Sequence, residues 1–435
     1  MLSAFGRAFK TPDLRKKLLF TLFIIAIYRL GAHVPTPGVS YPLVQQCIQN
    51  APTGGGFLGL ANLFSGGALL QLSIFALGIM PYITASIIVQ LLTVVIPRFE
   101  TLKKEGHAGQ QKMTQYTRYL TIGLAILQSA TLVTFAQNPS SLMQGCERVL
   151  VDDKISTILI MVLTMTAGTG MIMWLGELLT DKGVGNGMSI LIFTSIVASF
   201  PGSLWLIRQQ NGWGIFLAII AMGFLIIALV VFVEQSQRRI PVQYAKRMVG
   251  RQMYGGTSTY IPIKVNMANV IPVIFAASLM ALPMMIAQFN TNPTGASPGW
   301  VTWINNTLVN GDHPIYMILY TLLILFFTFF YVSITFNPEE VADNMKRYGG
   351  FIPGIRAGKP TAEYLQYVLT RITVVGAIYL ALISLIPLIA IAVINANQNF
   401  PFGGTSILIM VGVGLETVKQ IEAQLHQRHY EGFLR

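Results

Sequence analysis

The side chains that could do acid–base or metal chemistry are few in this 435-residue chain, and they do not cluster. Its five histidines fall in predicted loops or in the C-terminal tail: His33, His107, His313, His426 and His429. The sequence contains no glycine-rich phosphate loop, no metal-ligand spacing and no nucleophile constellation. We therefore expect a protein that is not an enzyme and that holds neither a cofactor nor a metal.

Acidic and basic residues are missing from the middle of every long apolar segment. Ion-coupled transporters place ionisable groups at that depth to bind the coupling ion. A path lined by Ile, Met, Gly and a few amides is a poor ion site, but it suits a pore that closes by excluding water. Two classes stay open from the residues alone: a passive channel, and a ten-span secondary transporter with inverted repeats. The missing intramembrane charge favours the channel.

Apolar helices are the elements that must position such a path. The chain is 53% hydrophobic and 11% charged, with a mean hydropathy of +0.60, whereas soluble domains carry about 25% charge. We therefore predict an all-α integral membrane protein. Ten segments have the length needed to cross a bilayer, about 20 residues each: 18–34, 73–96, 119–136, 155–176, 187–206, 213–233, 267–288, 315–336, 372–394 and 403–423.

The loops between these segments differ strongly in charge. Loops on one predicted side carry 25 of the 29 Lys and Arg residues, and loops on the other side carry three. Basic loops stay in the cytoplasm, so both termini are predicted to be cytoplasmic. No small-residue cleavage site follows the basic N-terminus and its apolar run, which we interpret as an uncleaved first span. Cys47 and Cys146 fall on the opposite side, where a disulfide is permitted, although two free cysteines are the simpler expectation.

The stretch 57–97 joins a short apolar piece to a full-length one. Residues 57–69 are too few to cross a bilayer and include Gly66 and Gly67, whereas 73–96 can cross with Pro81 inside it. A half-length piece must enter the membrane from one side and stop. Backbone at that depth is tolerated only where protein surrounds it or where it faces water. The stretch therefore predicts a short re-entrant helix within a central cavity.

Internal repetition is faint. Division near residue 207 gives five spans in each half, 1–206 and 207–435, with opposite starting sides. Ile79-x-Pro81-x-Ile83 on the second span corresponds to Val270-x-Pro272-x-Ile274 on the seventh. Proline-interrupted spans at matching positions indicate an inverted repeat around a central site. The pattern is weak alone, because proline is common in membrane helices.

Two cytoplasmic loops are longer than retention of positive charge requires. In 234–266, the segments RRIPVQYA and STYIPIKV flank KRMVGRQMYGG, which predicts a hairpin with a basic tip. In 337–371, the sequence predicts a short helix followed by a Gly/Pro-rich turn that presents Arg356. Ordinary topology charge is the alternative explanation. The length of both loops favours a docking role.

Taken together, the motifs resemble the bacterial SecY family, the channel subunits of the Sec protein translocon. The resemblance runs from the first span to the last and includes loop sequence. It is carried by these stretches: NLFSGGALLQLSIFALGIMPYITASIIVQLLTVV, KKEGHAGQQKMTQYTRYL, GVGNGMSILIF, RRIPVQYAKR, YIPIKVNMANVIPVIFA, FNPEEVADNMKRYGGFIPGIR and PFGGTSILI.

The resemblance implies a channel for unfolded secretory polypeptides, with ten helices in two inverted halves around a pore. It implies a pore ring of six residues: Ile79, Ile83, Met188, Ile192, Ile274 and Ile409. Met at position 188 departs mildly from the family pattern, but a compliant thioether side chain still closes a gap. The short piece becomes the plug, with these residues: Phe57, Leu60, Leu63, Phe64, Ser65, Gly66 and Gly67.

The resemblance also implies a lateral gate between spans 2–3 and 7–8, through which apolar segments leave into lipid. Its residues are Thr84, Ile87, Gln128, Asn266 and Leu282. Docking of the motor or the ribosome is implied for Lys246, Arg247, Arg251 and Arg356. The expected partners are the SecE and SecG subunits, the SecA ATPase, the ribosome, signal peptides, nascent chains and membrane lipids. The expected location is the bacterial plasma membrane.

Overall fold

The computed structural model describes residues 11–50, 65–137, 149–152, 154–244, 247–249, 252–254, 258–289, 298–309, 313–394 and 404–431. Several predicted site residues lie outside this part of the chain: Phe57, Leu60, Leu63, Phe64, Lys246 and Arg251. Cys146 lies outside it as well. For Cys47 and Leu282, the helix is described but not the side chain.

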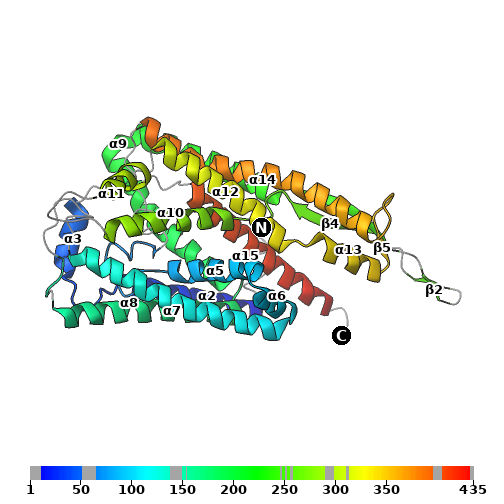
Figure 1. The fold of residues 1–435 in the computed structure, drawn as a ribbon, viewed down its shortest axis with the longest axis horizontal. Coiled ribbons are helices and arrows are strands. Elements are labelled where there is room, and N and C mark those ends of the chain that lie inside the picture. The colour runs from blue at the N-terminus through cyan, green and yellow to red at the C-terminus, as the bar shows by residue number, and fades with distance from the viewer. Residues whose placement is uncertain are drawn as a thin grey trace.

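Long helices make up most of the described chain. They are α2 (Pro12–His33), α3 (Tyr41–Asn50), α5 (Met80–Val95), α6 (Pro97–Lys104), α7 (His107–Gln137), α8 (Ile155–Lys182), α9 (Gly187–Gln235), α10 (Ile271–Phe289), α11 (Gly299–Ile304), α12 (Pro314–Thr335), α13 (Pro338–Arg347), α14 (Lys359–Ile394) and α15 (Gly404–Glu431), with a π-helical segment at Asn305–Val309. The longer helices run mainly along the long axis of the molecule, with α3 and α11 at one end and α13 at the other (Figure 1).

These helices agree with a multi-pass membrane protein. Each of the ten predicted spans overlaps a helix. Four described stretches are long and apolar enough to cross a membrane by themselves, namely Ile155–Lys182, Gly212–Gln235, Pro314–Arg347 and Lys359–Ile386. A fifth candidate is the pair formed by α5 and α6, which is bent by 104°. The number of ten spans stays a prediction.

The predicted span 73–96 is helical only from Met80 onward. Before it, Ser73 forms an antiparallel bridge with Pro35, and turns fill most of residues 66–79. Pro81 therefore lies in the first turn of α5 and does not bend a continuous span. A missing N–H costs no helical hydrogen bond at that position, so proline is favoured there. Pro272 is likewise the second residue of α10, so both prolines mark helix starts.

The connection between the predicted spans 187–206 and 213–233 is also helical up to Gly212. α9 runs through Pro201 and breaks at Gly212, whose φ of 75° and ψ of −177° are not helical. Two predicted spans thus meet at one sharp break. It lies a few residues after the predicted boundary between the halves, which itself stays a prediction.

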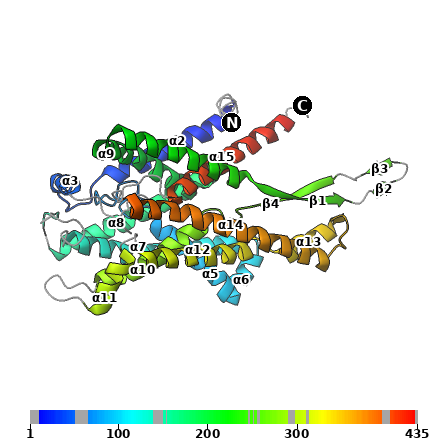
Figure 2. The ribbon, with the colours of Figure 1, turned by 90° about the horizontal axis from the view of Figure 1, so that it is seen from above.

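The strands lie at the end of the molecule opposite α3, beyond the long helices (Figure 2). β1 (Gln237–Tyr244) pairs antiparallel with β4 (Ser258–Lys264), and β2 (Arg247–Val249) pairs with β3 (Gln252–Tyr254), so the predicted hairpin is confirmed. The predicted short helix is α13. Its cap is Asn337, whose side chain accepts a hydrogen bond from the Glu339 N–H.

The sequence did not predict that the two long loops join. β5 (Gly350–Phe351) pairs with β1, which gives one sheet in the order β4-β1-β5. Apolar side chains of the sheet, including Ile240 and Ile263, pack with Met345 of α13 and Leu365 of α14. The hairpin and the 337–371 loop are therefore parts of one folded unit.

Candidate pore and seal

The six residues predicted for the pore ring share one apolar cluster. Four of them are buried within it: Ile79, Ile192, Ile274 and Ile409. The other two, Ile83 and Met188, are partly buried and pack against it. They come from α5 and the residue before it, from α9, α10 and α15, and so from both predicted halves. All six therefore belong to one large apolar cluster, and their arrangement as a ring stays a prediction.

Close backbone contacts fix Met188 at the start of α9. The Asn186 side chain accepts hydrogen bonds from the Met188 and Ser189 N–H groups at 3.1 and 3.4 Å and so caps the helix. A Cβ atom on Gly187 would overlap the carbonyl oxygen of Gly176 in α8, and a Cβ on Gly176 would overlap the Met188 sulfur. At position 187 only glycine lets α8 and the start of α9 approach this closely, because the clash there is with backbone atoms, whereas the clash at 176 is with the flexible end of the Met188 side chain.

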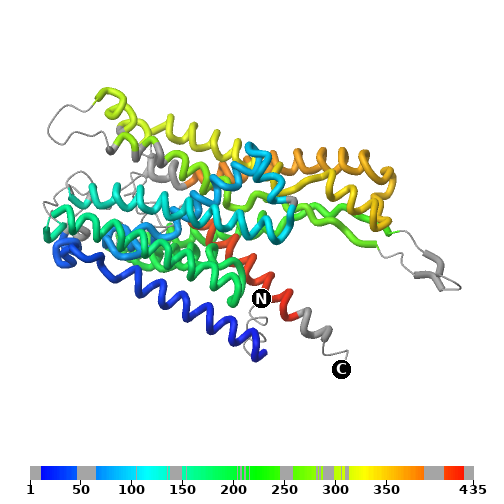
Figure 3. The backbone as a smooth tube through the Cα atoms, turned by 60° about the horizontal axis from the view of Figure 1, so that its bottom comes forward, coloured from blue at the N-terminus to red at the C-terminus, as the bar shows by residue number. Residues whose placement is uncertain are grey.

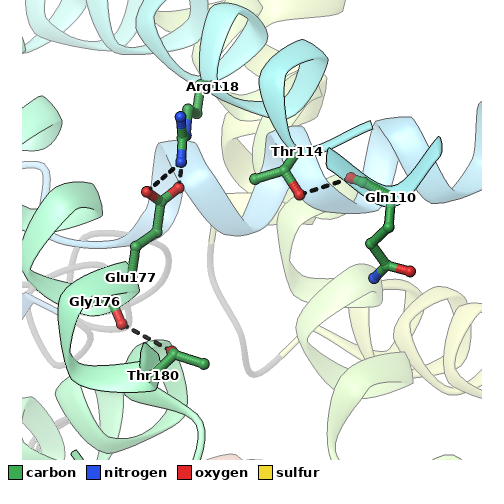
Figure 4. A network of polar contacts seen from close by, with 6 residues as sticks. All are labelled: Gln110, Thr114, Arg118, Gly176, Glu177 and Thr180. Atoms are coloured by element: carbon green, nitrogen blue, oxygen red, sulfur yellow. Dashed lines mark hydrogen bonds and ion pairs between the residues drawn. The ribbon is translucent and has the colours of Figure 1, made fainter. Parts of the chain in front are cut away.

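Polar contacts hold α8 in place around this glycine pair (Figure 4). The Thr180 hydroxyl donates to the Gly176 carbonyl at 2.9 Å and accepts from the Gly187 N–H at 2.9 Å. One residue from Gly176, the Glu177 carboxylate accepts two hydrogen bonds from Arg118 of α7, at 2.8 and 2.7 Å. Bidentate pairs of this kind fix geometry as well as supplying energy. Met188, a predicted ring residue, thus packs against α8, which the Arg118–Glu177 pair joins to α7.

The described end of the predicted plug, Ser65–Gly67, is held by Arg29 of α2. The Arg29 Nη1 atom donates to the Gly66 carbonyl oxygen at 3.0 Å. Gly66 has a φ of +67°, and a Cβ there would lie 2.8 Å from Arg29 Nη1 and 3.1 Å from the Cα of Ser195 in α9. Position 66 therefore requires glycine for both its backbone conformation and its space.

A second set of contacts orients Arg29. Its Nη2 lies 3.2 Å from His33 Nε2, and His33 Nδ1 lies 3.1 Å from Gln71 Oε1. Arginine only donates, so Nε2 accepts, and the proton resides on Nδ1 and is donated to Gln71. His33 thus connects Arg29 to the turn that follows the predicted plug.

Buried side chains of α2 and α9 pack next to the Arg29–Gly66 contact. The buried Tyr28 hydroxyl is hydrogen bonded to the Ser195 hydroxyl at 2.6 Å, and its ring stacks on Phe75 with centroids 5.9 Å apart. These contacts tie α2 and α9 together directly beside Gly66.

The predicted lateral-gate residues have varied surroundings. α5 and α10 contact each other. Thr84 donates to the Met80 carbonyl within its own helix, Ile87 is buried in the apolar cluster, and Gln128 is half-buried on α7. The buried Asn266 amide donates to Glu234 Oε1 at 2.6 Å and to the Asn269 carbonyl at 3.2 Å. The gate role of these residues stays a prediction.

Glu234 is a polar residue that sequence reasoning missed. It is buried at the end of α9, where it accepts the Asn266 hydrogen bond. Its position at the edge of an apolar segment gave no signal, because the partner is 32 residues away. The pair links the end of α9 to the turn that leads into α10.

The residues predicted for docking that belong to the described chain lie at the strand end of the molecule. Arg247 belongs to β2, and Arg356 is exposed in the turn between β5 and α14. The Arg356 carbonyl accepts a hydrogen bond from the Thr361 hydroxyl at 2.8 Å, which fixes the turn. Within the described residues, no group of three His, Cys, Asp or Glu side chains could hold a metal ion.

Two solved structures share this fold. One is described as showing that the plug domain of the SecY protein stabilises the closed state of the translocation channel. It matches with a TM-score of 0.63 at 20% identity, over 94% of this chain and 92% of its own. The other is Sec61 in the canine ribosome-channel complex from the endoplasmic reticulum, with a TM-score of 0.61 at 18% identity and the same coverage. The fold is therefore that of translocation channels.

Sequence comparison identifies the family. The sequence profile of the SecY family matches residues 73–418. A relative from Streptomyces galbus, named protein translocase subunit SecY, is 65% identical over 442 residues that cover all of both chains. The chain belongs to the SecY family.

Proposed function

We propose that this chain is the protein-conducting channel of a bacterial translocase, through which unfolded polypeptides cross the plasma membrane. The observation that carries the proposal is the meeting of six apolar residues from both halves in one cluster. A narrow apolar constriction dewets and so blocks ions without binding them. It also offers no hydrogen bonds to a passing chain and cannot retain one.

The plug and the ring act as two seals in series. The 57–69 segment closes the channel from outside, and the Arg29 bond to Gly66 holds its end in the closed state. Met188 and the isoleucines part around a polypeptide and close again behind it, because their contacts are apolar and non-directional. The secondary-transporter alternative receives no support from the family of the chain.

Apolar segments leave sideways through a gate between α5 and α7 on one side and α10 and α12 on the other. Hydrogen bonds between membrane helices average about 0.6 kcal/mol, so a polar residue such as Gln128 favours closure without locking it. The Thr84 hydroxyl donates within α5, to the Met80 carbonyl. Ile87 supplies apolar packing on the same seam. Signal peptides and membrane segments are the occupants that this gate fits.

The strand end of the molecule faces the cytoplasm and binds the partner that drives translocation, the ribosome or the SecA ATPase. Its Arg247 and Arg356 suit binding to the phosphate backbone of ribosomal RNA, with salt-sensitive affinity. The sequence has no ATP site of its own, so an ATPase partner is needed, and the same arginines would bind the SecA ATPase. A relative of this fold was solved in a ribosome-channel complex. We place both termini in the cytoplasm on the charge of the loops, divide the halves at 206/207, and expect SecE and SecG as partner subunits.

Ion leak from vesicles tests the pore. Purified chain in liposomes should be nearly ion-tight, and the double variant Ile83→Gly/Ile274→Gly should leak, because glycine widens the constriction and lets it wet. The matched control is Ile318→Gly/Ile378→Gly, two isoleucines on α12 and α14 whose side chains are 62% and 50% exposed. An unchanged seal in the first variant, or an equal leak in the second, contradicts the pore assignment.

A further inference from the structure

At the break in α9, the Arg208 guanidinium lies over the rings of two tryptophans. Its Cζ atom is 4.4 Å from the ring centroid of Trp205 and 4.2 Å from that of Trp213. Both distances are well inside the range of cation–π attraction, for which tryptophan is the best partner. Trp213 also meets Phe216 edge to face, with centroids 5.9 Å apart. The cation thus contacts two aromatic rings.

The local backbone explains why these three side chains meet. Trp205 and Arg208 are three residues apart on the first segment of α9, so they share one helix face. The helix then breaks at Gly212, and Trp213 follows directly on the far side of the break. The break brings the second ring back over the guanidinium of the first segment.

The N–H donors of this guanidinium have no hydrogen-bond partner within the described part of the chain. The two tryptophans that contact it keep 55% and 60% of their surface exposed, so the cluster is open to a ligand. Cation–π attraction leaves the N–H donors free to form hydrogen bonds. Such a guanidinium is suited to bidentate binding of an anion such as a phosphate.

The position of this cluster indicates where such an anion would come from. The α9 break lies at the end of the molecule opposite the strands (Figure 2). The next turns of α9 expose Leu217, Phe224 and Leu225, each more than half accessible, as expected for a lipid-facing surface. Tryptophan is enriched where such surfaces reach the headgroup region of a bilayer.

We propose that Trp205, Arg208 and Trp213 form a binding site for the phosphate of an anionic phospholipid in the leaflet opposite the strand end. The guanidinium edge binds the phosphodiester, and the two indole rings lie at headgroup depth beside the glycerol. The bound lipid holds the α9 break, where the two halves of the chain join, at a fixed depth. This site is separate from the ring, the plug and the lateral gate.

Lipid-selective quenching of tryptophan fluorescence tests the site. The whole chain is reconstituted in phosphatidylcholine vesicles that contain increasing amounts of brominated phosphatidylglycerol, with brominated phosphatidylcholine as the comparison. We expect the parent chain to prefer the anionic lipid by about fivefold, the factor that one cation near an anionic surface contributes. Arg208→Gln should abolish this preference, and Arg208→Lys should weaken it, because an ammonium group cannot bind a phosphate in the bidentate manner of a guanidinium.

The control variant is Lys154→Gln, a cation on the same predicted side that pairs with Asp152 at 3.4 Å. It should leave the preference unchanged. An equal loss in Lys154→Gln, or an unaltered preference in Arg208→Gln or Arg208→Lys, overturns the site in favour of general surface charge. Excess inorganic phosphate distinguishes the source of the anion. Quenching that persists in its presence supports a lipid site, and quenching that it removes shows a site for free anions.

Discussion

Replacement of Arg29 by glutamine should open the seal. The shorter, neutral side chain cannot reach the Gly66 carbonyl, so the contact at 3.0 Å is lost together with the link to His33. The apolar ring itself is untouched, because Arg29 contacts the end of the plug and not the ring cluster. The variant therefore separates plug retention from ring closure.

The size of the effect follows from the bond that is removed. A hydrogen bond with a charged donor contributes about 1.5–3 kcal/mol. Arg29 is only partly buried, so the lower figure applies, and about 1.4 kcal/mol changes an equilibrium constant tenfold. The population with a displaced plug should rise about tenfold, provided that the bond exists only in the closed state.

Single-channel recording in planar bilayers measures this population as the frequency of brief openings without a translocating chain. The matched control is Lys154→Gln, which breaks the ion pair with Asp152 at 3.4 Å but leaves the plug and ring contacts intact. Its opening frequency should stay near that of the parent. If Arg29→Gln opens no more often than Lys154→Gln, the Gly66 contact does not retain the plug.

Three further outcomes are expected. Arg356→Glu should block secretion while leaving abundance and insertion intact, since it reverses an exposed charge at the docking end; normal secretion would remove the docking role. A Thr84→Cys/Leu282→Cys crosslink should form in the idle state and should trap signal sequences outside the gate; failure of the crosslink to form contradicts the proposed seam. Gly187→Ala should destabilise the chain by about 1–3 kcal/mol through overpacking, and thermal unfolding should show no such loss for Gly214→Ala, where a Cβ meets open space.

Local patterns predicted the elements well. Two strand-like segments, RRIPVQYA and STYIPIKV, on either side of a basic tip marked the β1–β4 hairpin, and the Asn337-Pro338 start marked α13. Both depend on neighbours in sequence. The helix break at Gly212 also had a local signal, the Asn211-Gly212 pair, which is a turn dipeptide. The prediction ended one span at 206 and began the next at 213, whereas the helix continues to the break.

The sequence did not predict contacts between residues that lie far apart along the chain. Apolar periodicity does not distinguish Ile79 or Ile409 from any other buried isoleucine, so their convergence was expected only from the family resemblance. The union of β5 with β1 and the Glu234–Asn266 bond join segments tens of residues or more apart. No pattern in the sequence marked Arg29, because its partner Gly66 lies 37 residues further along.

Two kinds of contact surround the proposed pore, backbone packing and side-chain hydrogen bonds, and they differ in how readily they break. Met188 is positioned by the backbone approach of Gly187 to Gly176, which cannot lengthen without separating α8 from α9. The end of the plug is held by side-chain hydrogen bonds of modest energy, which exchange readily with water. A channel must open often while its helices stay packed, so we expect the hydrogen bonds of Arg29 to break when the channel opens. The glycine pair should stay in contact in both states.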